Sequence, residues 1–387
     1  MNPVRIIGRE AACNLGWNWD DVWAGLLRGE ARVASFSSIR QPISGLDLQV
    51  AMIPDLDREV LDDPPGAGAT FRLTRAVLRS LESGTIATKT RLFGASNHGE
   101  SDALIELVRA ADGAINRPHA DALLPAMASD LVRIHAPDAM YLGGPVWVYS
   151  ACSSSLHALA LAVASLAEAQ GSEETALVVA ADALSPLAVA GFYRAGAIAR
   201  RGCAPFDPVS DGLLIGEGAG AIHLGSSTGG SGATIAGIGM TCDAGHPTLP
   251  DPEATQLERA IRKALTRANI DAAEVDLVVA HGTGTAANDR AEAKALERVF
   301  GQGTVPVTSI KGMVGHCMGA AGILNLLVAE RALVEGIAPA AIPSRDAVAG
   351  VDVVLGSPRC LERRRSALAL AAGFGGNNVA VVLKNEN

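Results

Sequence analysis

The stretch VYSACSSSLHALALA at residues 148–162 passes from an apolar strand-like run to a helix rich in Ala and Leu, with a thiol between them. Unpaired backbone N–H groups at the start of a helix favour an anion, so the sequence predicts that the thiolate of Cys152 is stabilised there. A buried structural cysteine is the ordinary alternative, because free cysteine is among the most buried residue types. The rest of the chain has to distinguish these two interpretations.

The same succession of strand and helix recurs along the chain. Apolar, β-branched runs alternate with stretches rich in Ala and Leu, at residues 146–150, 176–181, 276–281, 290–300, 305–310 and 322–333. Such alternation is typical of buried, mostly parallel strands that helices cover on both faces. The sequence therefore predicts an α/β fold.

The order of these elements is repeated. The segment VPVTSIKGMVGHCMGAAGILNLL (305–327) has the plan of the segment around Cys152, and ALVVAADALS (176–185) pairs with LALAAGFGGNN (368–378). A Gly- and Ser-rich joint at 225–233 separates the two parts. We therefore predict a duplicated unit with halves 1–224 and 225–387, whose strand ends converge on one cleft.

Composition narrows the class of protein. The net charge of −9 argues against nucleic acid as a partner, because phosphate binding needs clustered Lys and Arg. The six cysteines lack metal-binding spacing and no secretory leader is recognised, which predicts free thiols in a reducing cytoplasm. The uncharged run 312–329 contains His316 and Asn325, so we expect a buried helix there and not a membrane span.

Two histidines in the second part follow apolar strands. His281 ends the run DLVVAH and precedes GTGT, whereas Lys311 and His316 follow VPVTSI. Each histidine alone is more often a core residue. Together the three residues form a catalytic set. The cysteine at a helix start in one half supplies a nucleophile, and the two histidines at strand ends in the other half supply acid–base groups.

At this point the chain resembles the β-ketoacyl synthases, the condensing enzymes of fatty-acid and polyketide synthesis. The resemblance extends over nearly the whole chain in the family's order, through SACSSSLHAL (150–159), PFDPVSDGLLIGEGAGAIHL (205–224), GMTCDAGHPTLPDP (239–252), HGTGTAANDRAE (281–292), SIKGMVGHCMGAAG (309–322) and GFGGNNVAVVL (373–383). It implies a duplicated thiolase-like fold, layered α-β-α-β-α with two mixed sheets.

The resemblance also implies roles for the motif residues. Cys152 would take an acyl group from a carrier thioester, and its own N–H and that of Phe374 would form the oxyanion hole. His281 and His316 would hold the malonyl thioester and stabilise the enolate that forms when carbon dioxide leaves. The carbanion would then attack the acyl group on Cys152.

Further positions follow from the same resemblance. Lys311 would orient the site, paired with Glu292, while Thr283 and Thr285 would bond the phosphopantetheine arm. Phe374 would gate the passage from loading to extension. The expected partner is an acyl carrier protein, the expected assembly is a homodimer or a ketosynthase heterodimer, and no metal or redox cofactor is expected.

The chain departs from the family pattern in three places. Leu370, Ala371 and Ala372 stand where relatives carry Asn-Ser-Phe, which predicts a wider acyl pocket. The region before 72 is acidic where many relatives are basic, so we expect carrier docking on five arginines: Arg72, Arg75, Arg79, Arg200 and Arg201. The Ser96-Asn97-His98 segment also differs from the glycine-richer loop of relatives, and the sequence gives no account of it.

Two motifs suggest other classes of enzyme. GTGTAA (282–287) fits a dinucleotide fingerprint, but the next strand ends in Lys311, where a ribose-binding carboxylate would be needed. GSSTG (225–229) fits a serine-hydrolase elbow, but no helix follows that serine. Both motifs are better interpreted as turns.

Within the resemblance, three alternatives remain. A thiolase would need a second cysteine in the C-terminal glycine loop, and GFGGNN has none. A chain-length-factor-like partner subunit usually lacks the nucleophile, which this chain carries. A non-elongating acyltransferase would keep Cys152 without extending chains, and only an assay separates it from a condensing enzyme.

Overall fold

A computed structural model describes residues 4–36, 48–56, 68–81, 89–99, 101, 105, 140–141, 144–168, 174–225 and 233–385. Within these described ranges, twelve strands form the main sheet. Those of the first half are β1 (Val4–Cys13), β4 (Lys89–Ala95), β5 (Met140–Tyr141), β6 (Val146–Val148), β7 (Glu174–Asp182) and β9 (Gly218–Gly225). Those of the second half are β10 (Thr234–Cys242), β11 (Leu277–Val279), β12 (Pro306–Thr308), β14 (Asp352–Val353), β16 (Ser366–Gly373) and β17 (Asn377–Lys384).

The helices surround and separate these strands. They are α1 (Trp19–Leu27), α2 (Ala69–Ser80), α6 (Ser154–Glu168), α7 (Pro186–Arg194), α8 (Thr255–Ala268), α9 (Ala286–Phe300), α10 (Lys311–Val314) and α11 (Ala321–Glu335), with short 3-10 turns η3 (Ala272–Glu274) and η4 (Met318–Ala320). In the part of the chain that the structure describes there are also two small sheets. One comprises β2 (Ala34–Ser35), β3 (Gln49–Ala51) and β8 (Ile215–Gly216), and the other pairs β13 (Ile337–Ala338) with β15 (Arg359–Cys360).

The strand pairing confirms the predicted duplication. In the first half the order β1-β9-β7-β4-β6 has two antiparallel pairs followed by two parallel pairs. The order β10-β17-β16-β11-β12 in the second half has the same sequence of pairings. The two predicted sheets are joined edge to edge, because β1 also pairs with β10 at two positions. The domain boundary at 224/225 remains a prediction, and residues 226–232 of the joint lie outside the described residues.

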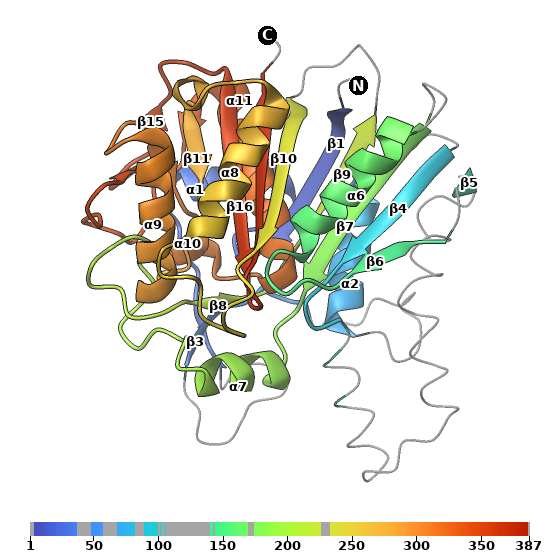
Figure 1. The fold of residues 1–387 in the computed structure, drawn as a ribbon. Coiled ribbons are helices and arrows are strands. Elements are labelled where there is room, and N and C mark those ends of the chain that lie inside the picture. Colours follow the sequence, from blue (N-terminus) through green and yellow to red (C-terminus); the bar gives the residue numbers. More distant parts are fainter. Residues whose placement is uncertain are drawn as a thin grey trace.

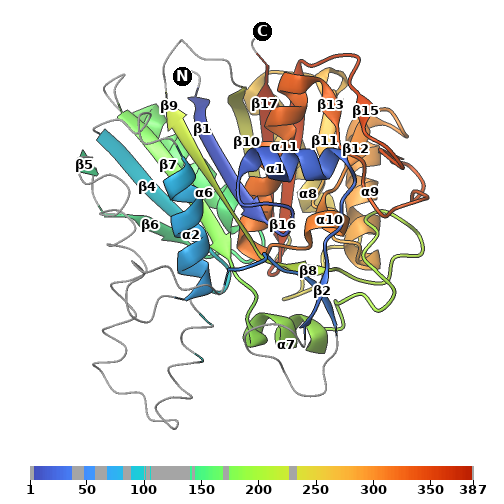
Figure 2. The same ribbon diagram turned by 180° about the vertical axis from the view of Figure 1, so that it is seen from behind.

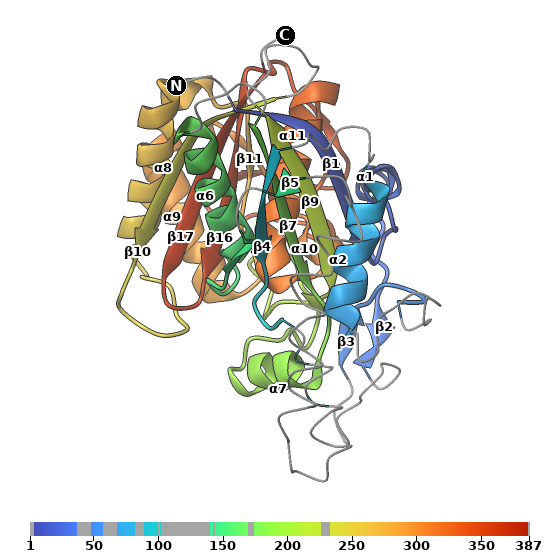
Figure 3. The same ribbon diagram turned by 90° about the vertical axis from the view of Figure 1, so that its right-hand side faces the viewer.

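The elements form five layers, as predicted. Figure 3 views them edge-on: α8 lies outside the sheet of the second half, α6 lies between the two sheets, and α2 lies outside the sheet of the first half. Figure 1 shows α8 and α6 on the near side, and Figure 2 shows α1 and α2 on the opposite side. Because α6 and α11 touch strands of both halves, one inner core serves both sheets.

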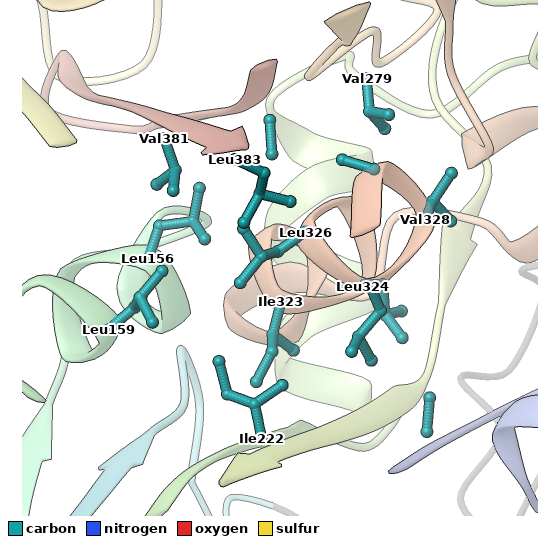
Figure 4. Packing of buried hydrophobic residues seen from close by; sticks show 14 of the residues in the cluster. Leu156, Leu159, Ile222, Val279, Ile323, Leu324, Leu326, Val328, Val381 and Leu383 are labelled. Carbon is teal, nitrogen blue, oxygen red and sulfur yellow. The ribbon is translucent and has the colours of Figure 1, made fainter. Parts of the chain in front are cut away.

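The inner core is built from alternate residues of the strands. Figure 4 shows Leu156 of α6 and Ile323 of α11 beside Val381 of β17 and Ile222 of β9. The residues between them on β17, such as Val382, face the outer core beneath α8 and α9. This period-two alternation lets one strand bury both its faces, and it fixes the two halves against each other.

Two apolar helical segments bear on the membrane question. The predicted buried run 312–329 forms α10, η4 and part of α11, all of it buried, which confirms that expectation. The window Ala151–Glu168, mean hydropathy 1.3, is long and apolar enough to cross a membrane by length and composition alone, and half of it is buried. A core helix passes the same test, and α6 packs on strands of both sheets.

Candidate active site

A single cavity brings together the predicted site residues from both halves. Its volume is about 320 Å³, and Cys152, His281, Thr283, Thr285, His316, Ala372 and Phe374 all line it. Most of them follow the end of a strand: Cys152 comes after β6, the histidines after β11 and β12, and Phe374 after β16, whereas Ala372 lies within the last two residues of β16. The converging strand ends of the duplicated fold thus place these side chains in one cleft.

Cys152 lies on a strained turn and is buried. The preceding residue, Ala151, has a φ of +48°, a left-handed conformation that turns the chain sharply between β6 and α6. Cys152 is 3% exposed. Burial raises the pKa of its thiol to about 12, and the charge of Asp182 acts in the same direction. This direction is opposite to the stabilisation of a free thiolate that was expected at the helix start, because desolvation disfavours the charged form.

Backbone N–H groups nevertheless point at the Cys152 sulfur. Hydrogen bonding from the N–H of Phe374 and from the N–H of Cys152 itself lowers the pKa of the thiol against the effect of burial. These are the two donors that the resemblance implies for an oxyanion hole. Because they are backbone groups in short turns between neighbouring elements, they can stabilise negative charge without reorganising.

The two histidine rings face each other inside the cavity. The ring centroids of His281 and His316 are 5.3 Å apart and the planes are nearly perpendicular at 82°. Burial lowers the pKa of both rings well below the usual histidine value, and the positive charge of Lys311 adds to the effect. Both imidazoles are therefore neutral near pH 7, so each can donate one N–H to a substrate oxygen.

Lys311 and Glu292 lie behind His281 and hold its backbone. Glu292 accepts the N–H groups of His281 (2.7 Å) and Gly282 (2.8 Å), and Lys311 donates to the His281 carbonyl. In place of the predicted direct pair, Lys311 and Glu292 each form a hydrogen bond with the backbone of His281. Burial lowers the pKa of Lys311 and raises that of Glu292 to about 7, and each charge partly offsets the effect on the other.

Thr283, Thr285 and Ala372 lie on the cavity wall, whereas Ala371 does not. The hydroxyls of Thr283 and Thr285 lie 2.8 Å apart on the cavity wall. Ala372 also lines the cavity, but Ala371 is fully buried in the inner core because adjacent strand residues face opposite sides. Only Ala372 can widen the pocket, so including Ala371 in that prediction was wrong.

Phe192 is a residue of the cavity that was not predicted from the sequence. Its ring lies 5.5 Å from the ring of Phe374 and 6.2 Å from that of His316, and it lines the cavity. The segment PLAVAGFYR shows an amphipathic helix, which places Phe192 on the buried face. That pattern cannot indicate that the buried face of α7 closes a site built by distant strands.

The predicted docking arginines fall into two groups: three lie on α2, namely Arg72, Arg75 and Arg79, and two follow α7, namely Arg200 and Arg201. Arg75 is buried on α2, which covers the outer face of the first-half sheet, so its inclusion in a docking surface was wrong. Arg200 and Arg201 are exposed, and Arg201 pairs with Asp211, which lines the cavity. Only this second group lies at the mouth of the site.

The unexplained Ser96-Asn97-His98 segment is fixed by a buried carboxylate. Asp182, at the end of β7, accepts hydrogen bonds from the Ser96 hydroxyl and from the N–H groups of Asn97 and His98. The segment is therefore an ordered turn that is hydrogen-bonded to the end of β7, the strand that pairs with β4.

Comparison with known proteins gives the family. Residues 77–228 match the model "Beta-ketoacyl synthase, N-terminal domain" and residues 232–344 match "Beta-ketoacyl synthase, C-terminal domain". The chain belongs to the β-ketoacyl synthase family.

Individual relatives agree with this assignment. Nodulation protein E of Rhizobium meliloti is 37% identical over 63% of this chain and 62% of its own length. The 3-oxoacyl-(acyl-carrier-protein) synthase 2 of Coxiella burnetii is 32% identical over 66% and 65%, respectively. The matches thus span less than two thirds of these relatives. A solved structure, "The ishigamide ketosynthase/chain length factor", superposes with a TM-score of 0.87 and 26% identity over the full length of both chains.

Proposed function

We propose that this protein condenses an acyl group with a malonyl group, with loss of carbon dioxide, to give a 3-oxoacyl thioester on an acyl carrier protein. The observation that carries the proposal is the arrangement of Cys152, His281 and His316 in one cavity, with the Phe374 N–H directed at the thiol. The relative in Coxiella burnetii is named a 3-oxoacyl-(acyl-carrier-protein) synthase, and the ishigamide structure is named a ketosynthase/chain length factor. Both names support the same reaction.

In the first half-reaction, the Cys152 sulfur attacks the carbonyl carbon of the carrier thioester. The new carbon–sulfur bond replaces the old one, and the thiol proton leaves with the carrier sulfur. Because burial raises the pKa of the Cys152 thiol, we expect proton transfer to accompany the attack. The N–H groups of Phe374 and Cys152 stabilise the oxyanion of the tetrahedral intermediate.

In the second half-reaction, the two neutral imidazoles bind the thioester carbonyl of the malonyl group. Loss of carbon dioxide leaves an electron pair, which these two N–H donors stabilise as an enolate. The carbanion attacks the acyl carbon on Cys152, a carbon–carbon bond forms, and the Cys152 sulfur leaves as a thiolate, which takes up a proton from water to restore the thiol. The lost carbon dioxide supplies the driving force, so the reaction needs no metal or redox cofactor.

The proposed partner is an acyl carrier protein, whose phosphopantetheine arm would pass Thr283 and Thr285. The exposed Arg200 and Arg201 near the mouth would attract its acidic surface. The assembly would be a homodimer or a heterodimer with a second ketosynthase-like subunit. The six cysteines are all free, which supports a location in the reducing cytoplasm.

The test is acylation followed by extension. We expect intact-protein mass to show one acyl adduct after incubation with acyl carriers, absent in Cys152→Ala and retained in Cys203→Ala. Cys203 is a matched control because it is equally buried, its pKa is also about 12, and it does not line the cavity. Addition of malonyl carrier should then release a 3-oxoacyl product.

Each alternative gives a different result. A non-elongating acyltransferase would form the adduct without carbon–carbon bond formation. A partner subunit would form neither adduct nor product. An acyl adduct that persists in Cys152→Ala would overturn the proposed mechanism.

A further inference from the structure

Asp182 is a buried carboxylate that connects the two halves of the molecule beside the active site. Its side chain is fully buried. Besides the donors of residues 96–98 in the first half, it accepts the N–H of Gly319 in the second half at 2.7 Å. Gly319 belongs to η4, which follows His316 by two residues.

Gly319 can approach the carboxylate because it has no side chain. A Cβ at this position would lie 2.7 Å from the Asp182 Oδ2 and 2.8 Å from the Asn97 nitrogen. Neither backbone nor a fully bonded carboxylate can move away cheaply. The contact between Asp182 and η4 is therefore a close fit that only glycine permits.

The residue before Gly319 is held in a strained conformation. Met318 has a φ of +48°, in the left-handed region, and its side chain is fully buried. For a residue other than glycine this conformation is unfavourable and persists only where the surroundings enforce it. The hydrogen bond from Gly319 to Asp182 constrains the peptide plane that follows Met318, so it helps to hold this conformation.

The Met318 side chain packs in the apolar cluster that contains Cys152. Phe192 and Leu213 belong to the same cluster and also line the cavity, whereas Met318 belongs to the cluster without lining the cavity. A chain attached to Cys152 and directed into this cluster would have to displace Met318. An unbranched thioether adapts easily, but here its backbone is fixed.

We infer that Asp182 is a positioning residue which, through Gly319, holds Met318 against Cys152, and that this arrangement limits the length of the group that Cys152 can carry. The role of this arrangement in selecting acyl groups rests on the proposed function. The geometric content of the inference, the control of space beside Cys152, can be tested without any enzymatic activity.

The experiment uses alkylation of Cys152 by iodoacetamide and by N-decyl iodoacetamide, followed by intact-protein mass. The ratio of the two rates cancels any change in the reactivity of the thiol itself. We expect Asp182→Asn to raise the ratio of long to short probe by about tenfold, because releasing roughly 1.4 kcal/mol of constraint corresponds to that factor. Met318→Gly should raise it at least as much, since glycine adopts the left-handed region freely and leaves space.

The double variant decides whether Asp182 acts through Met318. If it does, adding Asp182→Asn to Met318→Gly changes the ratio by less than about twofold. Should Asp182→Asn not fold, Gly319→Ala breaks the same contact without removing the charge, and the same ratio applies. Asp207→Asn is the matched control: Asp207 also accepts backbone N–H groups, from Val209, Arg345 and Asp346, but it does not line the cavity.

An unchanged ratio in Asp182→Asn or Gly319→Ala overturns the inference. So does an equal gain from Asp182→Asn in the wild-type protein and in the Met318→Gly variant, because Asp182 would then act by another route. A shift of the ratio in Asp207→Asn would indicate general loosening and count against it as well. Failure of wild-type protein to accept an acyl group, with the ratios as expected, would overturn only the proposed function.

Discussion

In the resting protein, the side chains at the centre of the site are held in their uncharged forms. Burial keeps Cys152 a thiol, and burial with the charge of Lys311 keeps His281 and His316 neutral. Charge therefore develops only during the reaction, where fixed donors meet it. This is the arrangement that stabilises a transition state more than the ground state.

We expect His281→Ala and His316→Ala to lose condensation activity while keeping the fold. Removing one fixed donor to developing negative charge typically lowers the rate by about 10²–10³. The double variant should lose less than the product of the two effects, because both rings act on one intermediate. Product formation by mass spectrometry and thermal unfolding of each variant measure the two properties.

Cys152 acylation provides the control for these histidine variants. It should survive in both, because the Phe374 N–H and the nucleophile remain in place. A variant with near-normal product formation would show that its histidine takes no part in the second half-reaction.

Among the strands and helices, close contact between β10 and α8 depends on glycine. A Cβ on Gly237 would lie 2.2 Å from the Ala264 carbonyl oxygen, and one on Gly239 would lie 1.9 Å from that of Ala260. The facing residues of α8 are alanines, so both elements present small side chains. The helix backbone therefore packs almost directly on the strand.

We expect Gly239→Ala to lower the free energy of unfolding by roughly 1–3 kcal/mol, because α8 has to move away from β10. Gly191→Ala makes the same chemical change on an exposed face of α7, where nothing lies within 4 Å of the added carbon. That control should leave stability unchanged or slightly raised, since Ala favours helix. Urea unfolding of both variants gives the comparison, and equal losses would contradict the packing argument.

Local patterns predicted the elements well and their contacts less well. The strand, small-residue turn and helix around Cys152 and around His316 could be predicted because each lies within about 20 consecutive residues, and parallel strands bring such turns to one edge. The contact of Asp182 with Gly319 could not, because it joins positions 137 residues apart. The raised pKa of Cys152 also escaped prediction, since burial depends on the whole assembly and not on the helix start.

The molecule as a whole buries titratable groups whose effects on stability oppose each other. Burial lowers the pKa of His223, in the middle of β9, to about 4, and both its ring nitrogens lack a partner among the described residues. Burial raises the pKa of Asp289 to about 6 and that of Glu292 to about 7. The unfolded chain binds a proton at His223 between pH ~6.5 and 4 when the folded chain does not, which destabilises the fold in acid. The two carboxyls have the opposite effect, because the folded chain keeps their protons to higher pH.

Comparing His223→Leu with the wild-type protein isolates the histidine from this balance, because the carboxyls contribute equally to both. At pH 7 His223 is neutral in the folded chain and mostly neutral in the unfolded chain, so the difference in unfolding free energy reflects packing and the unsatisfied ring. On lowering the pH to 5, the wild-type protein should lose about 2 kcal/mol relative to the variant, since 1.5 units lie between pH 5 and the ordinary histidine pKa of about 6.5. Urea unfolding of both proteins at the two pH values measures it. A difference that stays constant between pH 7 and 5 would mean that His223 is protonated in the folded chain, and therefore that it has found an acceptor or water within the sheet.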